Sequence, residues 1–299
     1  MLKEPAYRRG KYNKNYEEED MNTKTIDNAS NGALLKEIEN RGYFASKIPP
    51  QKTNKVFRGE IKTGKRYKFG VLADTQMGSM YQQMTHLHSF YKMCEEEKVD
   101  AMFHAGDVVD GEKVYRGQEY ELFIHGADAQ RDYAIKNYPS IKGVKTYMIS
   151  GNHDASFWSV SGYNVVQAIC EARDDLVFLG DNYATYMIGA IKIALMHGAG
   201  GVAYARSYKL QKIIEQISPE NKPHMLFLGH YHCEDIQPMY RNVVGIQLPC
   251  FQSQTPYLAR GGLYPELGGW IIEFGVNDKG FTDIVYRDKP FYVPIKKDY

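Results

Sequence analysis

Side chains that can bind metal ions follow several short apolar segments of the chain, each directly after the segment ends. The segments are VLADTQ with Asp74 and Gln76, HAGDVVDG with Asp107 and Asp110, ISGNHD with Asn152, His153 and Asp154, IALMH with His197, and LGHYH with His230 and His232. In a layered α/β fold the carboxyl ends of the strands converge on one crevice, so residues far apart in sequence can meet there. The pattern therefore predicts one site.

The residue types indicate a divalent metal. Imidazole together with carboxylate and amide oxygens suits manganese, iron or zinc, and no cysteine stands at a ligand spacing. The donors are too many for one ion. With one carboxylate shared, they suit two ions roughly 3.5 to 4 Å apart, which activate a water and hold a phosphate for in-line displacement. Gly106, Gly151 and Gly229 beside the donors allow tight turns.

The elements that must position these residues alternate between apolar strands and amphipathic helices. We expect strands at 67–73, 101–105, 145–150, 175–180, 191–197, 225–230, 243–248 and 269–275. We expect helices at 84–98, 117–138, 162–173 and 205–217. Interleaved strands and helices followed by mostly strands predict an α/β or α+β layered sandwich. His104, inside the strand at 101–105, is expected to be a core histidine.

Taken together in this order, the five segments resemble the signature segments of the calcineurin-like metallophosphoesterase superfamily. The resemblance implies a four-layer αββα sandwich with a dinuclear metal site at the carboxyl ends of the strands. It implies that His153 is the general acid for the leaving oxygen and that Asp154 orients it. The metal ligands that it implies, with Asp107 bridging, are Asp74, Gln76, Asp107, Asn152, His197, His230 and His232.

Gln76 departs from the family pattern, which usually has a histidine at this position. An amide oxygen can coordinate a hard cation, but it is neutral and donates less strongly than imidazole. We therefore expect the first ion to bind less tightly. Manganese is the expected metal, with magnesium, iron or zinc as alternatives.

Four further segments resemble metallophosphoesterases found in phage, archaeal and bacterial genomes, a group distantly similar to double-strand-break repair nucleases. They are YRGQEYELFIHGADAQ, AYARSYKLQKIIE, YRNVVGIQ and FQSQTPYLARGGL. Tyr231, Phe251, Tyr257 and Arg260 are candidates for substrate binding by stacking and phosphate contact, although aromatic residues in loops often pack locally instead.

The expected function is hydrolysis of phosphodiester bonds by a hydroxide that two divalent metals activate. The substrate would be DNA or a nucleotide, so the chain would be a nuclease or a nucleotide phosphodiesterase. One alternative is a phosphomonoesterase or protein phosphatase. Another is a non-catalytic scaffold of the same fold, as in polymerase small subunits, which only Gln76 supports because His153 and the later donors are intact.

The rest of the chain adds less. Residues 1–24 are expected to be a mobile tail, 25–60 a small helical extension and linker, and 61–299 the metallophosphoesterase domain. The extension could instead be part of a winged helix that binds duplex DNA. The formal net charge of +1 predicts no general attraction to nucleic acid. Widely spaced cysteines and the lack of a long apolar segment favour a cytoplasmic protein without a membrane partner. The oligomeric state stays open.

Overall fold

The computed structural model describes residues 57–59, 66–277 and 280–299, all within the unit Gln51–Tyr299. The predictions for residues 1–24 and for 25–56 lie outside the described residues. Phe57–Gly59, at the end of the predicted extension, form strand β1, which pairs in parallel with β6. The domain boundary at residue 61 stays a prediction.

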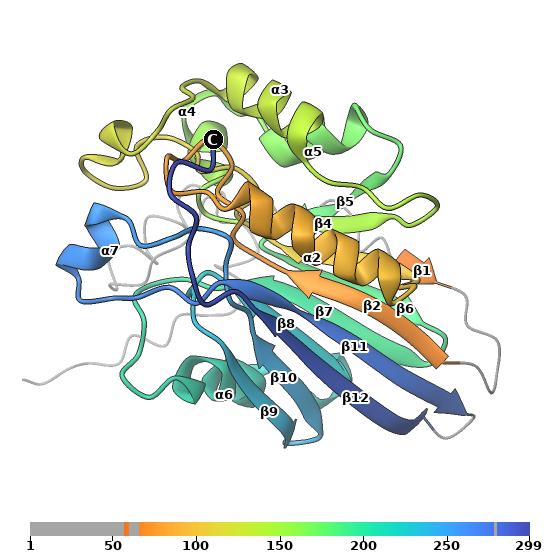
Figure 1. Ribbon diagram of the computed structural model, residues 1–299. Helices are drawn as coiled ribbons and strands as arrows, with labels where there is room; N and C mark the ends of the chain where they lie inside the picture. Colours follow the sequence, from red (N-terminus) through yellow and green to blue (C-terminus); the bar gives the residue numbers. More distant parts are fainter. Residues whose placement is uncertain (1–56, 60–65, 278–279) are drawn as a thin grey trace, which may run out of the picture. The chain divides into compact units, whose positions relative to one another are not determined.

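Two six-stranded sheets form the inner layers of this unit (Figure 1). The first has the order β12-β11-β2-β3-β4-β5, and its strands β2 to β5 are parallel. Its bounds are β2 (Arg66–Leu72), β3 (Ala101–Ala105), β4 (Thr146–Ser150), β5 (Leu176–Asp181), β11 (Gly268–Asn277) and β12 (Gly280–Pro290). Since β2, β3 and β4 are parallel, their carboxyl ends share one edge.

The second sheet has the order β1-β6-β7-β8-β10-β9, with β7, β8 and β10 parallel. Its further bounds are β6 (Tyr183–Ile188), β7 (Ile191–His197), β8 (Met225–Gly229), β9 (Asp235–Tyr240) and β10 (Val243–Gln247). β7 and β8 end at His197 and just before His230, respectively.

Helices cover the outer face of each sheet (Figure 1). Beside the first sheet lie α2 (Met84–Glu96), α3 (Ala127–Asn137), α4 (Ala155–Ser161) and α5 (Val165–Glu171). On the second sheet α6 (Ser207–Gln216) buries Leu210 and Ile214. The short α7 (Pro256–Arg260) lies in the connection to β11. The four-layer αββα sandwich expected from the sequence is thus confirmed.

Alternation of side chains along the strands fixes the layers. On β3, Phe103 faces the other sheet, whereas Met102 packs with the helices. Phe69 of β2 contacts Phe103 at 5.2 Å and Phe227 of the second sheet at 5.6 Å, both edge to face. Each fully buried side chain of this size contributes roughly 1.5–3 kcal/mol. The strand ends that carry the polar residues are therefore held by a continuous core.

One predicted helix is wrong in its first half. Residues 117–138 do not form a single helix, because α3 begins only at Ala127. Gly117 and Gly126 have φ of 95° and 90°, which a helix cannot contain. Between them lies a loop with a short 3-10 helix, Gln118–Tyr120.

Among the described residues, no helix is long and apolar enough to cross a bilayer.

Candidate metal centre

The chain leaves the strands in an unusual backbone conformation at the predicted donors. Five of the seven predicted metal ligands have positive φ: Asp74 (55°), Gln76 (46°), Asp107 (57°), His230 (92°) and His232 (53°). Such conformations are uncommon for residues other than glycine, cost roughly 1–3 kcal/mol each, and cluster at functional sites. The surrounding core must therefore hold these residues in place.

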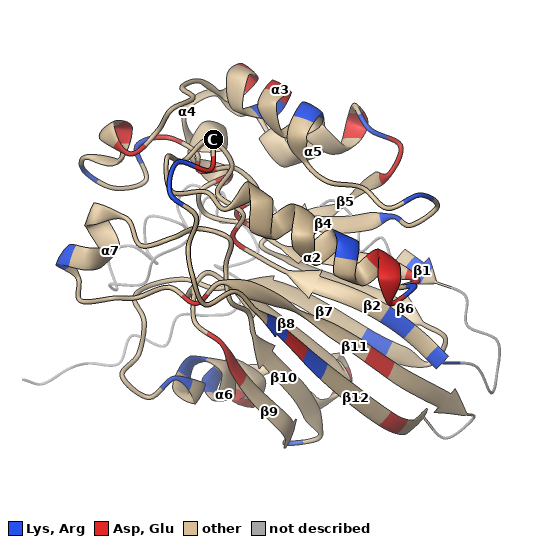
Figure 2. Ribbon diagram, in the orientation of Figure 1, with Lys and Arg blue, Asp and Glu red and all other residues tan. Residues whose placement is uncertain are grey.

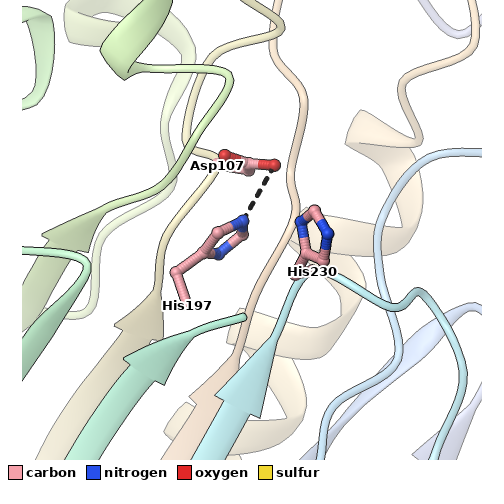
Figure 3. A group of neighbouring side chains, drawn as sticks. All are labelled: Asp107, His197 and His230. Carbon is pink, nitrogen blue, oxygen red and sulfur yellow. Dashed lines mark ion pairs between the residues drawn. The ribbon is translucent and has the colours of Figure 1, made fainter. Parts of the chain in front are cut away.

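Asp107, His197 and His230 form the centre of the site, with their ligand atoms all within 4.8 Å of one another (Figure 3). His197 Nδ1 lies 2.8 Å from the carbonyl oxygen of Ala105, so Nδ1 carries the proton of the neutral ring. Nε2 then directs its lone pair at Asp107 Oδ2 and at Asn152 Oδ1, each 3.1 Å away. These two oxygens and the lone pair on Nε2 are all acceptors, and they repel one another unless a cation lies between them. That cation would be either an extra proton or a metal ion.

Electrostatics of His197 agree with this geometry. Burial alone would lower the pKa of His197. The carboxylate of Asp107 stabilises the protonated ring, and the pKa is raised to about 9. His230 is oriented differently, since its Nε2 lies 2.9 Å from the carbonyl oxygen of Gly200. Nε2 therefore donates there, and Nδ1 of His230 is left as the ligand atom.

A second set of predicted donors lies beside the first. His232 Nε2 is 3.3 Å from Asp74 Oδ1, and the backbone N–H of His230 donates to Asp74 Oδ2 at 2.9 Å. Gln76 Nε2 donates to Asp107 Oδ2 at 3.1 Å. Gln76 Oε1 is buried, and no partner lies beside it in the described part of the chain. An unsatisfied buried oxygen costs about 1–3 kcal/mol, which a bound cation would remove.

The donor set therefore fits divalent metal ions. Asp107 joins the two sets, because its Oδ2 is in contact with His197 of the first set and with Gln76 of the second. Two glycines make this approach possible. A Cβ on Gly151 would lie 2.2 Å from Asp107 Oδ1, and one on Gly106 would lie 2.6 Å from His197 Nδ1.

His153 lies at the edge of the metal centre. Its backbone N–H donates to Asp107 Oδ1 at 2.9 Å, and its Nδ1 is 2.6 Å from the carbonyl oxygen of Asp110. Nδ1 must carry a proton to make that bond. Nε2, 4.0 Å from Asp107 Oδ2, is thus the atom that can give or take a proton in the site.

Asp154 makes different contacts from those expected of it. Its carboxylate accepts backbone N–H groups of Gly151, Val109 and Val108 at 2.8, 2.9 and 3.2 Å. It therefore ties the loop after β4 to the loop after β3, and the carbonyl of Asp110 orients the His153 ring instead.

A pocket of about 360 Å³ opens onto the metal centre. Two of the four predicted substrate contacts, Tyr231 and Tyr257, line it. Phe251 does not, because it is fully buried against Phe90 and Phe291 in the core. Arg260 is exposed at the end of α7, outside the lining.

Sequence reasoning missed other residues of the pocket wall. Tyr115 and Thr255 both line it. Tyr115 lies just before the segment that was wrongly assigned to a helix, so its direction could not be inferred. Thr255 caps α7 by accepting the N–H of Leu258, and Thr-Pro before a helix was the available signal.

Residues 67–234, more than half of the chain, match the calcineurin-like phosphoesterase family. The chain therefore belongs to the calcineurin-like phosphoesterases, a family of metallophosphoesterases.

Two curated relatives are named DNA polymerase II small subunit. The protein of Methanothermobacter thermautotrophicus is 25% identical over 198 residues, which cover 55% of this chain and 41% of that protein. The protein of Methanocaldococcus jannaschii is 28% identical over 194 residues, which cover 54% of this chain and 32% of that protein. The chain thus spans less than half the length of these relatives.

Among solved structures, Vacuolar Protein Sorting 29 of Cryptosporidium parvum is 16% identical, with 76% of this chain and 99% of that chain covered and a TM-score of 0.41. A phosphatase of Mycoplasma pneumoniae is 13% identical, with 76% and 95% covered and a TM-score of 0.42. At these values the likeness carries no information on activity.

Proposed function

We propose that the chain is a divalent-metal-dependent hydrolase of phosphodiesters, with nucleic acid or nucleotides as substrates. The observation that carries the proposal is the meeting of Asp107, His197 and His230 beside a pocket that Asp107, His230 and His153 line. Manganese is the proposed metal, bound as two ions. When bound, such ions supply a nucleophile at neutral pH and neutralise the charge that develops on the phosphate.

The residues that would hold the ions fall into the two sets described above. His197, Asn152 and His230 would serve one ion, and Asp74, His232 and Gln76 the other, with Asp107 between them. Asp107, Asn152, His230 and His232 line the pocket, so a phosphate that enters it meets both sets.

His153 is proposed as the general acid. Its ring is fixed by the bond from Nδ1 to the Asp110 carbonyl, and its side chain is 13% exposed, on the pocket. In the protonated ring Nε2 can donate to the departing oxygen of the ester. A positioned histidine of this kind contributes roughly 10²–10⁴-fold to rate.

The names of the curated relatives favour DNA over phosphoproteins as the substrate, because those proteins are subunits of a DNA polymerase. The same names support a second candidate function, a subunit that binds a larger polymerase chain without hydrolysing anything. Charge gives no general preference, since basic and acidic residues are interspersed over the elements (Figure 2). On the first sheet, for instance, Glu273 pairs with Arg287 at 2.9 Å and with Lys68 at 3.6 Å.

Hydrolysis of bis(p-nitrophenyl) phosphate in the presence of manganese separates the two functions. We expect turnover by the wild type, loss of at least two orders of magnitude in Asp107→Asn, and no change in Asp128→Asn, whose side chain is 80% exposed on α3. Equal rates for the wild type and Asp107→Asn would leave the subunit function as the better account.

A further inference from the structure

One wall of the pocket is a stacked pair of aromatic rings. Tyr115 and Tyr257 lie with ring centroids 4.1 Å apart and planes 20° from parallel. Tyr115 belongs to the loop before the 3-10 helix and Tyr257 to α7, and both line the same pocket as Asp107 and His230. The Tyr115 ring centroid is 6.2 Å from that of His153. The wall is therefore next to the place where the ester would react.

Glu121 fixes the pair of rings from behind. Its carboxylate accepts the Tyr115 hydroxyl at 2.7 Å and the backbone N–H of Tyr257 at 3.2 Å. Its own carbonyl accepts the N–H of Met80 at 2.8 Å, and the residue is only 7% exposed. Two segments far apart in sequence are thus joined before any ligand arrives, which lowers the entropy cost of binding.

The wall suits a planar, uncharged group. Tyr257 is 45% exposed although Tyr115 covers one face of its ring, so the rest of the ring is open to a ligand. Val114, Leu258 and Leu263 add apolar surface beside it. No Lys or Arg is among the described residues that line the pocket, so a second phosphate would find neither of these cations beside the two tyrosines. A nucleobase, which stacks on aromatic rings regardless of sequence, satisfies these conditions.

We propose that the Tyr115–Tyr257 wall is the subsite for a nucleobase whose phosphate lies at the metal centre. The inference rests on the proposed function for the position of the phosphate. It narrows the substrate class to esters of nucleoside phosphates. Both a free nucleotide and the end of a single strand carry this chemistry.

Calorimetric titration with manganese present tests the subsite through binding alone. Thymidine 5′-monophosphate and 2-deoxyribose 5-phosphate carry the same sugar and phosphate, and only the first has a base. We expect thymidine 5′-monophosphate to bind roughly tenfold more tightly, the effect of one base on an aromatic ring. The preference should vanish in Tyr257→Ala and persist in Tyr257→Phe. It should also persist in the matched control Tyr264→Ala, whose side chain is 67% exposed and outside the pocket lining.

Equal binding of the two phosphates by the wild type, or a preference that survives Tyr257→Ala, would overturn the subsite. A thymidine oligonucleotide of about ten residues distinguishes the sources. Tighter binding than the mononucleotide, lost in Tyr257→Ala, identifies a single strand, and equal binding identifies a free nucleotide.

Hydrolysis of methyl p-nitrophenyl phosphate, which has no base, tests the proposed function separately. If the protein prefers the ligand with a base but does not hydrolyse this ester, the proposed subsite stands and the proposed hydrolase function is wrong. If it hydrolyses the ester without a preference for the base, the hydrolase function stands and the subsite is wrong.

Discussion

Acid should destabilise the fold through one buried histidine next to the candidate metal centre. His104 on β3 is fully buried, as expected of a core histidine, and its Nε2 lies 3.2 Å from Thr75 Oγ1. Thr75 Oγ1 already donates its proton to the carbonyl of Val108 at 2.8 Å, so it must accept from His104. The proton of the neutral ring is therefore on Nε2. Nδ1 is buried and has no partner in the described part of the chain.

Protonation of Nδ1 would place a charge and an unpaired N–H in the core. Burial accordingly lowers the pKa of His104 from 6.5 to about 4. The folded pKa is below the unfolded one, so between these two values the unfolded chain binds a proton that the folded chain does not. The free energy of unfolding is therefore at its full value above about pH 6.5 and decreases as the pH falls towards 4. A difference of this size corresponds to roughly 3 kcal/mol in full, and to about 2 kcal/mol by pH 5.

Urea unfolding followed by circular dichroism at about pH 7.5 and about pH 5 measures this loss, with EDTA present so that no metal contributes. In His104→Gln the amide can still donate to Thr75, and nothing titrates. Between these two pH values the free energy of unfolding should fall in both proteins. We expect the decrease to be about 2 kcal/mol smaller in this variant than in the wild type. His125→Gln, at a side chain that is 58% exposed, should fall as the wild type does. If the wild type and His104→Gln lose the same stability, the pKa of His104 is not lowered by burial and the reasoning is wrong.

Three other substitutions test the metal centre. Gln76→His should raise manganese affinity roughly tenfold in calorimetric titration, and unchanged affinity would mean that the amide is not a ligand. Gly151→Ala should lower the free energy of unfolding by about 1–3 kcal/mol and abolish metal binding, since its Cβ would lie 2.2 Å from Asp107 Oδ1. Gly261→Ala, with its nearest neighbour at 3.4 Å, is the control. Asp154→Ala should cost about 3 kcal/mol or more in urea unfolding because three backbone N–H groups lose their acceptor, whereas a cost below about 1 kcal/mol would contradict this role.

The central strands could be predicted because they are buried on both faces. Parallel strands inside a layered sandwich are continuous apolar segments, and AMFHA coincides with β3 from Ala101 to Ala105. The signal is weaker in strands that are not buried on both faces. β6, inside the second sheet, alternates between half-buried and buried residues and was not predicted. β9 contains a proline and the exposed Met239, and β12 carries exposed polar residues such as Asp283, so neither was predicted.

The candidate site divides in the same way. Residues directly after a central strand could be placed near one another, because the end of a parallel strand fixes where the chain leaves the sheet. The hydrogen-bond partner of the His153 ring, the carbonyl of Asp110, could not be predicted, because it depends on how the loops after β3 and β4 face each other. Aromatic residues in loops were ambiguous for a related reason: Phe251 turns into the core and Tyr257 into the pocket, although both belong to the same segment.

The energetics of the centre argue that the fold is adapted to bind a cation. Asp74, Gln76, Asp107, His230 and His232 each hold a left-handed backbone conformation at a cost of roughly 1–3 kcal/mol. Nε2 of His197 and two oxygens converge where only a positive charge satisfies all three. Stabilising substitutions are easy to find in most natural proteins. A chain selected for stability alone would therefore have replaced such strained residues. The glutamine at position 76, where the family usually has a histidine, changes one donor and leaves this arrangement in place, so it gives only weak support to a scaffold without metal.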